Sequence, residues 1–281
     1  MIGKPRQRLF VALLAAFWVL PLYAYDPLNR AEYLAKIKEA KAYYQEKCEK
    51  VAGVRIYRTV PDVEGLLLLK VRPDRTDHHL ADPMWPGAAF GTEYSGNSYI
   101  TSFIGYEKSP EGSRERGHIT TAEPSAAVSR DRWDYFPGYR WVEVIDEKDG
   151  RRYRYKLEYK DVTHIYSITI GGDGKPFTVK ENVLDKTPSP SKTPPRYAVT
   201  FEDHVIPEER ALWVASSTIK VLDLHTNEVL GETTIYAISY IHAPRHSMPW
   251  LNHSVCPTPG GRDGTRTRHF VDQVLIPKRE K

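Results

Sequence analysis

Histidines next to acidic residues are the first side chains of this sequence that could do chemistry, by holding a metal ion. His78 and His79 stand between Asp77 and Asp82. Neighbouring residues of an extended chain point to opposite sides, and this spacing matches no common zinc pattern. A solvated loop therefore explains the pair better than a metal centre does.

A second histidine group lies near the C-terminal end, where His242, His246 and His253 precede Cys256. The segment is irregular, so the three imidazoles have no fixed geometry, and a cysteine engaged in a disulfide is no metal ligand. We therefore predict that the protein binds no metal and no cofactor.

One weak pattern in the sequence could indicate a nucleophilic serine, the Ser-x-x-Lys spacing of Ser217 and Lys220. In penicillin-recognising enzymes this serine begins a helix and has companion motifs, whereas here it falls on a predicted strand without them. The sequence also lacks the Gly-x-Ser-x-Gly, His-Glu-x-x-His and phosphate-loop motifs. We predict no catalytic residue and expect that the protein is not an enzyme.

The first 24 residues read as a secretory signal peptide. Residues 1–8 contain Lys4, Arg6 and Arg8 and no acid, residues 9–22 are apolar, and Ala24 offers a small residue for cleavage. The apolar run is short for a membrane span, although an uncleaved anchor remains the alternative. We expect residues 25–281 to work outside the cytoplasm without a stable membrane anchor.

Cys48 and Cys256 are the only cysteines of the chain and lie near the two ends of its mature part. Disulfides persist outside the cytoplasm, so one bridge closing almost the whole domain is the favoured interpretation. Two free thiols are the alternative.

Composition indicates an ordinary globular protein, with 41% hydrophobic and 27% charged residues. The formal net charge of +4 includes the three bases of the signal peptide, so the mature chain is nearly neutral. No basic stripe is present to release counterions from a nucleic acid, and we expect no nucleic-acid partner. The 18 tyrosines and 6 tryptophans suit strands and protein interfaces.

An amphipathic helix is predicted to begin at Asp26-Pro27, as N-cap and first helical residue, and to end near Gly53. Its apolar positions recur every three or four residues, as one buried helix face requires. They are Tyr33, Ile37, Ala40, Tyr44, Cys48 and Val51.

Strands dominate the rest of the chain by their alternating or short apolar runs. The turns at residues 147–150 and 225–228 predict two hairpins, and residues 207–210 predict a helical turn. The predicted strands are residues 64–71, 98–106, 139–146, 151–159, 164–170, 197–202, 212–224 and 229–240, with 270–276 a strand or a short helix. The predicted class is α+β, with an N-terminal amphipathic helix, a mainly antiparallel sheet and the ends joined by the disulfide.

Residues 186–195 contain four prolines and cannot form a helix or a central strand. They are either a linker between two domains or a surface loop. We favour a loop within a single domain at 25–281, because the predicted bridge would couple both sides.

Several segments together resemble a family of largely uncharacterised secreted proteins of proteobacteria, which we associate with gene neighbourhoods of type VI secretion effectors. The resemblance covers most of the mature chain and is weak at residues 74–132. The segments are Cys48, Val63-Glu64-Gly65-Leu66, Lys70-Val71-Arg72-Pro73, YAVTFED at 197–203, ERALWVA at 209–215, VLDLHTNEVL at 221–230, Pro249-Trp250-Leu251, Cys256-Pro257, Arg268-His269-Phe270-Val271 and Val274-Leu275-Ile276-Pro277.

The resemblance implies an immunity protein that binds and neutralises a secreted antibacterial toxin, including toxins of the phospholipase kind. It brings no active-site motif, and its two cysteine positions match the predicted bridge. The alternative function is a periplasmic hydrolase with its site in residues 72–98.

Binding to a toxin would need aromatic and arginine anchors on loops, for which residues 72–98 and 109–130 are the candidates. The alternative for Trp85 and Trp133 is that they cap the core, since tryptophan is usually largely buried. The predicted anchors are Trp85, Tyr94, Arg114, Arg116, Trp133 and Tyr135.

Overall fold

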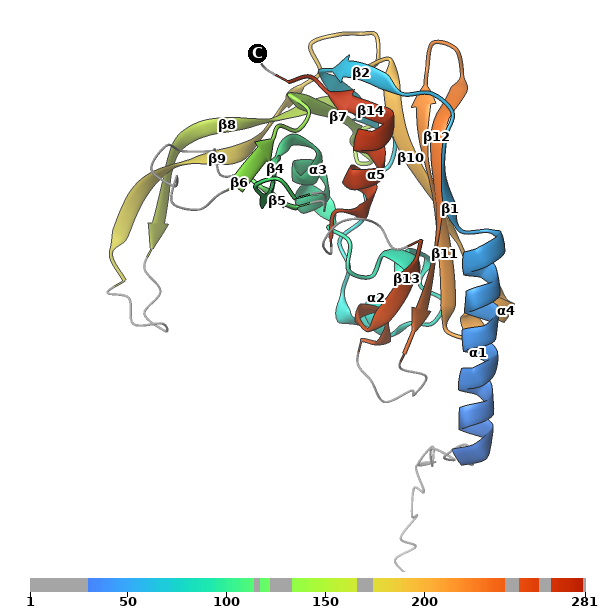
Figure 1. The fold of residues 1–281 in the computed structure, drawn as a ribbon. Helices are drawn as coiled ribbons and strands as arrows, with labels where there is room; N and C mark the ends of the chain where they lie inside the picture. Colours follow the sequence, from blue (N-terminus) through green and yellow to red (C-terminus); the bar gives the residue numbers. More distant parts are fainter. Residues whose placement is uncertain are drawn as a thin grey trace, which may run out of the picture.

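The computed structural model describes residues 30–113, 117–121, 133–165, 174–240, 248–257 and 264–279 (Figure 1). The predicted signal peptide and Asp26-Pro27 lie outside these residues. Within the described part of the chain, no helix is long and apolar enough to cross a membrane.

Helices and strands alternate irregularly along the chain, as in an α+β protein. The helices are α1 (Arg30–Lys50), α2 (Asp77–Ala81), α3 (Gly96–Ile104), α4 (Pro207–Ala211) and α5 (Arg266–Val274), with short 3₁₀ turns η1 (Pro86–Phe90) and η4 (Pro249–Leu251). The strands are β1 (Gly53–Ile56), β2 (Val60–Val63), β3 (Gly65–Leu68), β4 (Tyr106–Pro110), β5 (His118–Thr120), β6 (Trp133–Phe136), β7 (Trp141–Ile145), β8 (Arg152–Ile165), β9 (Pro176–Pro188), β10 (Tyr197–His204), β11 (Val214–Asp223), β12 (Glu228–Ser239), β13 (His253–Cys256) and β14 (Leu275–Pro277).

The main sheet runs in the order β1-β12-β11-β10-β3-β7-β8-β9, and β13 pairs with β12. Most neighbours are antiparallel, but β3 is parallel to both β10 and β7, so the sheet is mixed. The small sheets are β14-β2, which is parallel, and β5-β4-β6, which is antiparallel. The predicted α+β class is confirmed, with a sheet that is rich in antiparallel pairs.

Strand β12 has buried side chains on both faces, and successive side chains along it belong to two separate hydrophobic clusters. Ile235 and Ala237 belong to the large hydrophobic core, which also includes residues of η1, α3 and α5. Tyr236 and Ile238 point to the other side, where they form a small cluster with α1.

Helix α1 contacts this second face through the face that the sequence predicts. Ala40 is fully buried, and Tyr33, Ile37, Tyr44 and Cys48 are partly buried on the same side. Cys48 forms the predicted disulfide with Cys256 of β13, with 5.6 Å between the two Cα atoms. The bridge holds the end of α1 against the sheet.

The contact between α1 and the sheet should make the stability of the protein depend on pH. Burial raises the pKa of Tyr43 and of Tyr44 to about 12 each, and the hydrogen bond from Tyr43 to Glu209 (3.0 Å) adds to the shift. In the unfolded chain these phenols titrate near pH 10, so their contribution to stability is complete below pH 10 and lost as pH rises towards 12. We expect the urea midpoint to fall between pH 9 and 11 by less in a Tyr43→Phe, Tyr44→Phe variant than in the wild type. Equal falls in both proteins would contradict this account of the α1 interface.

The strand predicted at residues 98–106 is wrong, because residues 96–104 form helix α3. Tyr99, Ile100, Phe103 and Ile104 are buried at helical spacing. Two adjacent pairs four residues apart satisfy a helix face, and in so short a window they are easily taken for a buried strand.

Residues 72–98 are not the irregular loop that the sequence predicts. They contain α2, η1 and the start of α3, and Ala88, Ala89 and Phe90 are buried in the core. A Cβ atom on Gly91 would lie 2.2 Å from the carbonyl oxygen of Trp250, so the chain approaches η4 too closely for any side chain there.

The proline-rich segment is divided between two structures. Lys186, Thr187 and Pro188 end strand β9, which is the last strand of the main sheet. Edge strands tolerate proline because one row of their backbone groups needs no partner strand. Residues 189–196 continue without helix or strand to β10.

Candidate functional site

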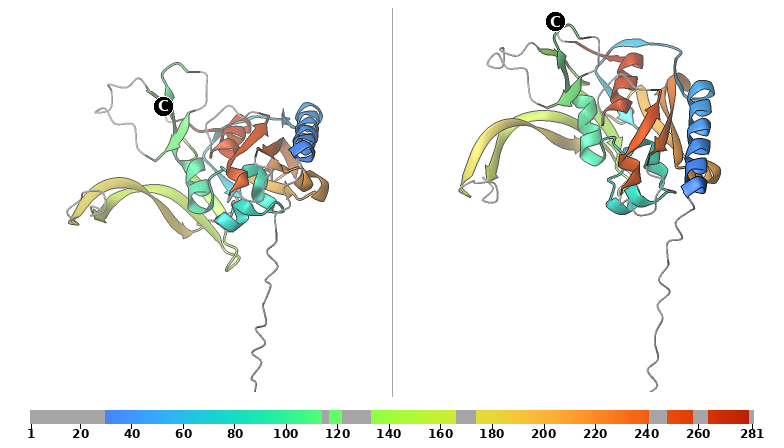
Figure 2. Two further views of the ribbon diagram at one scale, coloured as in Figure 1. Left: turned by 90° about the horizontal axis from the view of Figure 1, so that it is seen from below. Right: turned by 60° about the horizontal axis from the view of Figure 1, so that its bottom comes forward.

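The long hairpin of β8 and β9 extends well past the rest of the sheet. Strand β7 pairs only with residues 152–155 of β8, whereas β9 pairs with β8 as far as Ile165. Figures 1 and 2 show the far part leaving the body as a curved two-stranded ribbon. We call residues 159–165 and 176–182 the arm.

Both faces of the arm mix apolar and polar side chains, but its two most exposed large hydrophobic residues lie on one face. Directly opposite residues of an antiparallel pair share a face, so Tyr159, Ile165 and Asn182 lie on the same side as Leu157. Tyr159 is 59% exposed and Ile165 is 70% exposed on this inner face. The outer face has the ion pair of His164 with Glu181 at 3.2 Å, and Val179, which is 40% exposed, lies on the same face.

An isolated two-stranded hairpin is marginally stable in water. In the described part of the chain, no third strand pairs with the arm. Its exposed apolar side chains therefore lie on an element that gains stability from anything that covers it.

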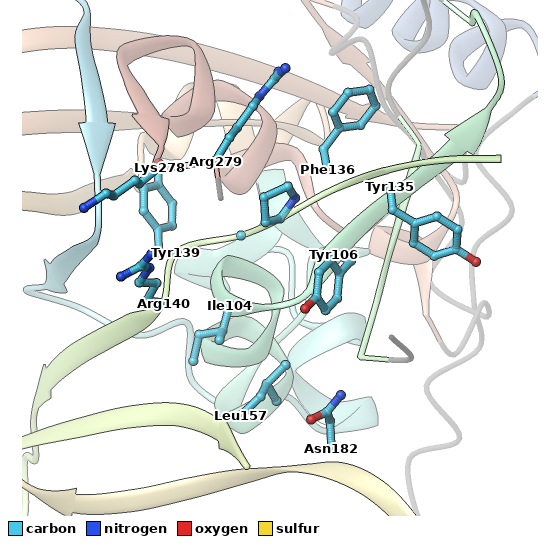
Figure 3. A pocket seen from close by; sticks show the side chains of 12 residues that line it. Ile104, Tyr106, Tyr135, Phe136, Tyr139, Arg140, Leu157, Asn182, Lys278 and Arg279 are labelled. Atoms are coloured by element: carbon cyan, nitrogen blue, oxygen red, sulfur yellow. The ribbon is translucent and has the colours of Figure 1, made fainter. Parts of the chain in front are cut away.

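A cavity of about 620 Å³ opens at the root of the arm (Figure 3). We call it the arm-root cavity. It lies where the arm, the three-stranded sheet and the C-terminal segment meet, and its described lining is Ile104, Tyr106, Tyr135, Phe136, Pro137, Gly138, Tyr139, Arg140, Leu157, Asn182, Lys278 and Arg279.

Three of these lining residues are cationic, and Glu64 is the carboxylate that pairs with two of them, Arg140 at 3.5 Å and Lys278. The hydrogen bond from Lys278 lowers the pKa of Glu64, which stays ionised at neutral pH. The guanidinium of Arg279 lies over the ring of Phe136, 5.4 Å from its centroid. The site is aromatic and positively charged.

Of the predicted anchors, Trp133 and Tyr135 are brought together on β6, two residues apart and so on one face. Both are partly buried. The ammonium group of Lys108 on β4 lies over both rings, at 4.6 and 5.7 Å from their centroids. Tyr135 also lines the arm-root cavity.

The other predicted anchors are not part of this cluster. Trp85 is 9% exposed and belongs to the core, so the capping alternative describes it. Tyr94 is 38% exposed and packs against Gly264. Arg114 and Arg116 lie outside the described residues.

A smaller cavity of about 350 Å³ lies in the region of the alternative hydrolase site, residues 72–98, and is lined by Arg72, Arg75, Trp85 and Asp203 among others. Arg72 Nη1 donates to both carboxylate oxygens of Asp203, at 3.1 and 3.2 Å. Burial lowers the pKa of Arg75. Arg72 and Asp203 are therefore engaged with each other, and Arg75 donates to the backbone carbonyl of Glu93.

Two of the residues first considered for chemistry, Ser217 and His79, have structural roles. Ser217 is fully buried and donates to Asp203 at 2.6 Å. His79 accepts from the backbone of Thr76 and caps α2, while its ring stacks on Trp85. Within the described ranges, no three His, Cys, Asp or Glu side chains gather as metal ligands, and His242 and His246 lie outside those ranges.

Sequence reasoning missed the arm-root cavity and the arm itself. The alternation at residues 151–159 does predict the first part of β8, but nothing in the pattern marks that β8 continues past the start of β7 as far as Ile165. The basic pair Lys278-Arg279 was a visible signal, although only the fold places it beside Arg140.

Comparisons with known proteins give no match to a family model, to a curated protein or to a solved structure.

Proposed function

We propose that this protein is a periplasmic immunity protein, which binds a secreted antibacterial effector and blocks it through the arm. A phospholipase effector fits the sequence resemblance. Neutralising a toxin requires a stable complementary surface and no chemistry of its own, and the signal peptide predicted at residues 1–24 would deliver the inhibitor to the compartment that the toxin enters.

The observation that carries the proposal is the exposed inner face of the arm. Tyr159 and Ile165 present large side chains to solvent on a hairpin that the rest of the described sheet leaves uncovered. Binding energy in protein interfaces concentrates on a few such large side chains, tyrosine among the most frequent. A projecting ribbon also reaches into a concave partner surface such as an active-site cleft.

The surface at the root of the arm extends the proposed interface. Trp133 and Tyr135 with Lys108 provide partly exposed aromatic and cationic groups next to the arm-root cavity. Trp85 is left out of the proposed interface because it is buried.

The test is capture of the mature, oxidised protein by the product of the adjacent toxin gene, followed by rescue of cells that carry that toxin in the periplasm. Stoichiometric capture with rescue is the expected result. A toxin that is neither captured nor neutralised would overturn the proposal.

Once the partner is known, substitutions in the arm test whether the arm is the interface. Tyr159→Ala with Ile165→Ala removes two exposed anchors and is expected to weaken the complex at least tenfold, a loss of the size that hot-spot residues produce. The melting temperature should not change, because neither side chain is buried. Tyr57→Ala is the matched control, since Tyr57 is 60% exposed on the far edge of the sheet. Equal binding by the arm variant and the control, measured by calorimetry, would exclude the arm as the interface.

The alternative, a periplasmic hydrolase with its site in residues 72–98, has the 350 Å³ cavity in its favour. A hydrolase screen of the mature protein tests it. Activity abolished by Asp203→Asn in a folded variant would support this alternative over the inhibitor.

A further inference from the structure

We infer that the arm-root cavity is a binding site for an amphiphilic anion, a small molecule with an apolar or aromatic body and one carboxylate, phosphate or sulfonate group. This site does not depend on the proposed function. It rests on the size, the walls and the charge of the cavity.

Size comes first. A cavity of about 620 Å³ falls within the range of about 300 to 1,000 Å³ that small-molecule sites occupy. The space lies between secondary-structure elements and is shaped by them: α3 and β8 contact each other, and β4 pairs with β6.

The walls would accept an apolar body. Ile104 of α3 and Leu157 of β8 supply aliphatic surface, and Tyr106, Tyr135 and Phe136 supply ring surface. Such side chains release ordered water when a hydrocarbon chain or an aromatic ring covers them. The amide of Asn182 is engaged with the backbone carbonyl of Thr121 at 2.9 Å, so it stiffens the wall.

The charge selects an anion. Arg140, Lys278 and Arg279 line the cavity, and none of its described lining residues is acidic. Glu64, which pairs with Arg140 and Lys278, lies beside them and is not part of the lining. A guanidinium binds a carboxylate or a phosphate with paired hydrogen bonds, so Arg140 and Arg279 suit such a head group.

The cationic side chains and the apolar walls of the cavity are separated in space, as binding of an amphiphile requires. Figure 3 shows Arg140 and Lys278 together beside Tyr139, with Leu157 and Asn182 at another end of the site, Ile104 between these two ends, and the rings of Tyr106 and Tyr135 to one side. An anionic head at the first end would place its body past Ile104 towards Leu157, with the tyrosine rings beside it.

The first experiment uses anilinonaphthalene sulfonate as a fluorescent probe with the full mature protein. We expect the fluorescence to rise to saturation as the probe binds, and to fall when decanoate displaces the probe. Decanol, which has the same chain without the charge, and inorganic phosphate, which has the charge without a body, should each compete at least tenfold more weakly. Displacement by decanol as strong as by decanoate overturns the anion specificity, and displacement by phosphate as strong as by decanoate overturns the amphiphile. Absence of saturable binding overturns the site.

Variants locate the binding. Arg140→Gln with Arg279→Gln leaves the Lys278–Glu64 pair in place and is expected to weaken decanoate binding about tenfold, because two charge-assisted contacts are lost. Arg55→Gln is the matched control, since Arg55 is an exposed arginine that pairs with Glu232 at 3.4 Å on another part of the surface. Wild-type affinity in the double variant would show that the probe binds elsewhere. Should the double variant fail to fold, Arg279→Glu reverses the charge of one exposed lining residue and is expected to weaken decanoate binding in the same way, and unchanged affinity in that variant overturns the site.

Discussion

Removing the Cys48–Cys256 disulfide is expected to lower the melting temperature by at least about 10 °C. The bridge joins residues 208 positions apart, and chain-entropy reasoning assigns about 5 kcal/mol to so long a loop. For a domain of this size, each kcal/mol shifts the melting temperature by about 2 to 4 °C. The measurement is thermal unfolding of a Cys48→Ser, Cys256→Ser variant beside the oxidised wild type.

The helix that the disulfide holds explains why the effect should be large. Helix α1 contacts the sheet through a small cluster with Val214, Tyr236 and Ile238, which is separate from the main core. Without the bridge, this limited apolar surface and the hydrogen bond from Tyr43 to Glu209 must keep α1 in place. The wild type treated with a reductant is the control and should melt with the double variant. A shift under about 2 °C, or two free thiols titrated in the unreduced, denatured protein, would contradict the prediction.

Replacing Arg72 by methionine is expected to destabilise the protein by about 3 to 5 kcal/mol, the loss that follows when one partner of a buried ion pair is removed. The Arg72 side chain is 5% exposed and that of Asp203 is 13% exposed, so water cannot replace the missing charge. The guanidinium also lies between the rings of Phe90 and Phe201, 3.7 and 4.0 Å from their centroids. Urea unfolding measures the loss.

Two comparisons separate the ion pair from simple packing. Arg72→Met with Asp203→Leu should lose less stability than Arg72→Met alone, since no unpaired charge stays buried. Arg55→Met breaks the exposed pair with Glu232 and should change stability little. A double variant less stable than the single one would show that Arg72 acts through its ring contacts and not through Asp203.

The hairpin of β11 and β12 shows how far local pattern carries. Its predicted strands at residues 212–224 and 229–240 are observed at Val214–Asp223 and Glu228–Ser239. Asn227 adopts a positive φ of 57° in the turn between them, as short hairpin turns require of an asparagine or glycine. The alternation of apolar and polar residues and the residue types of a turn are local properties of the chain, so they predict the hairpin without knowledge of the fold.

Helix α3 shows where local pattern fails. Residues 96–104 contain β-branched and aromatic residues that favour a strand, yet Phe103 and Tyr99 pack into the core as a helix. Tertiary packing outweighs intrinsic propensity in so short a segment. The same packing buries Ala88, Ala89 and Phe90 of residues 72–98, although the composition of that segment favours turns.

By itself, the sequence determined the α+β class, the buried face of α1 and the pairing of the only two cysteines, because periodicity and cysteine count are properties of the chain. Only the tertiary structure decided that β8 and β9 outrun the sheet and that a cavity opens beneath them. Ile104, Leu157 and Arg279 are far apart in the sequence and meet there through contacts that no local pattern encodes. The candidate site therefore forms only when distant segments of the chain pack together, and its combination of aromatic and cationic side chains exists only in the folded protein.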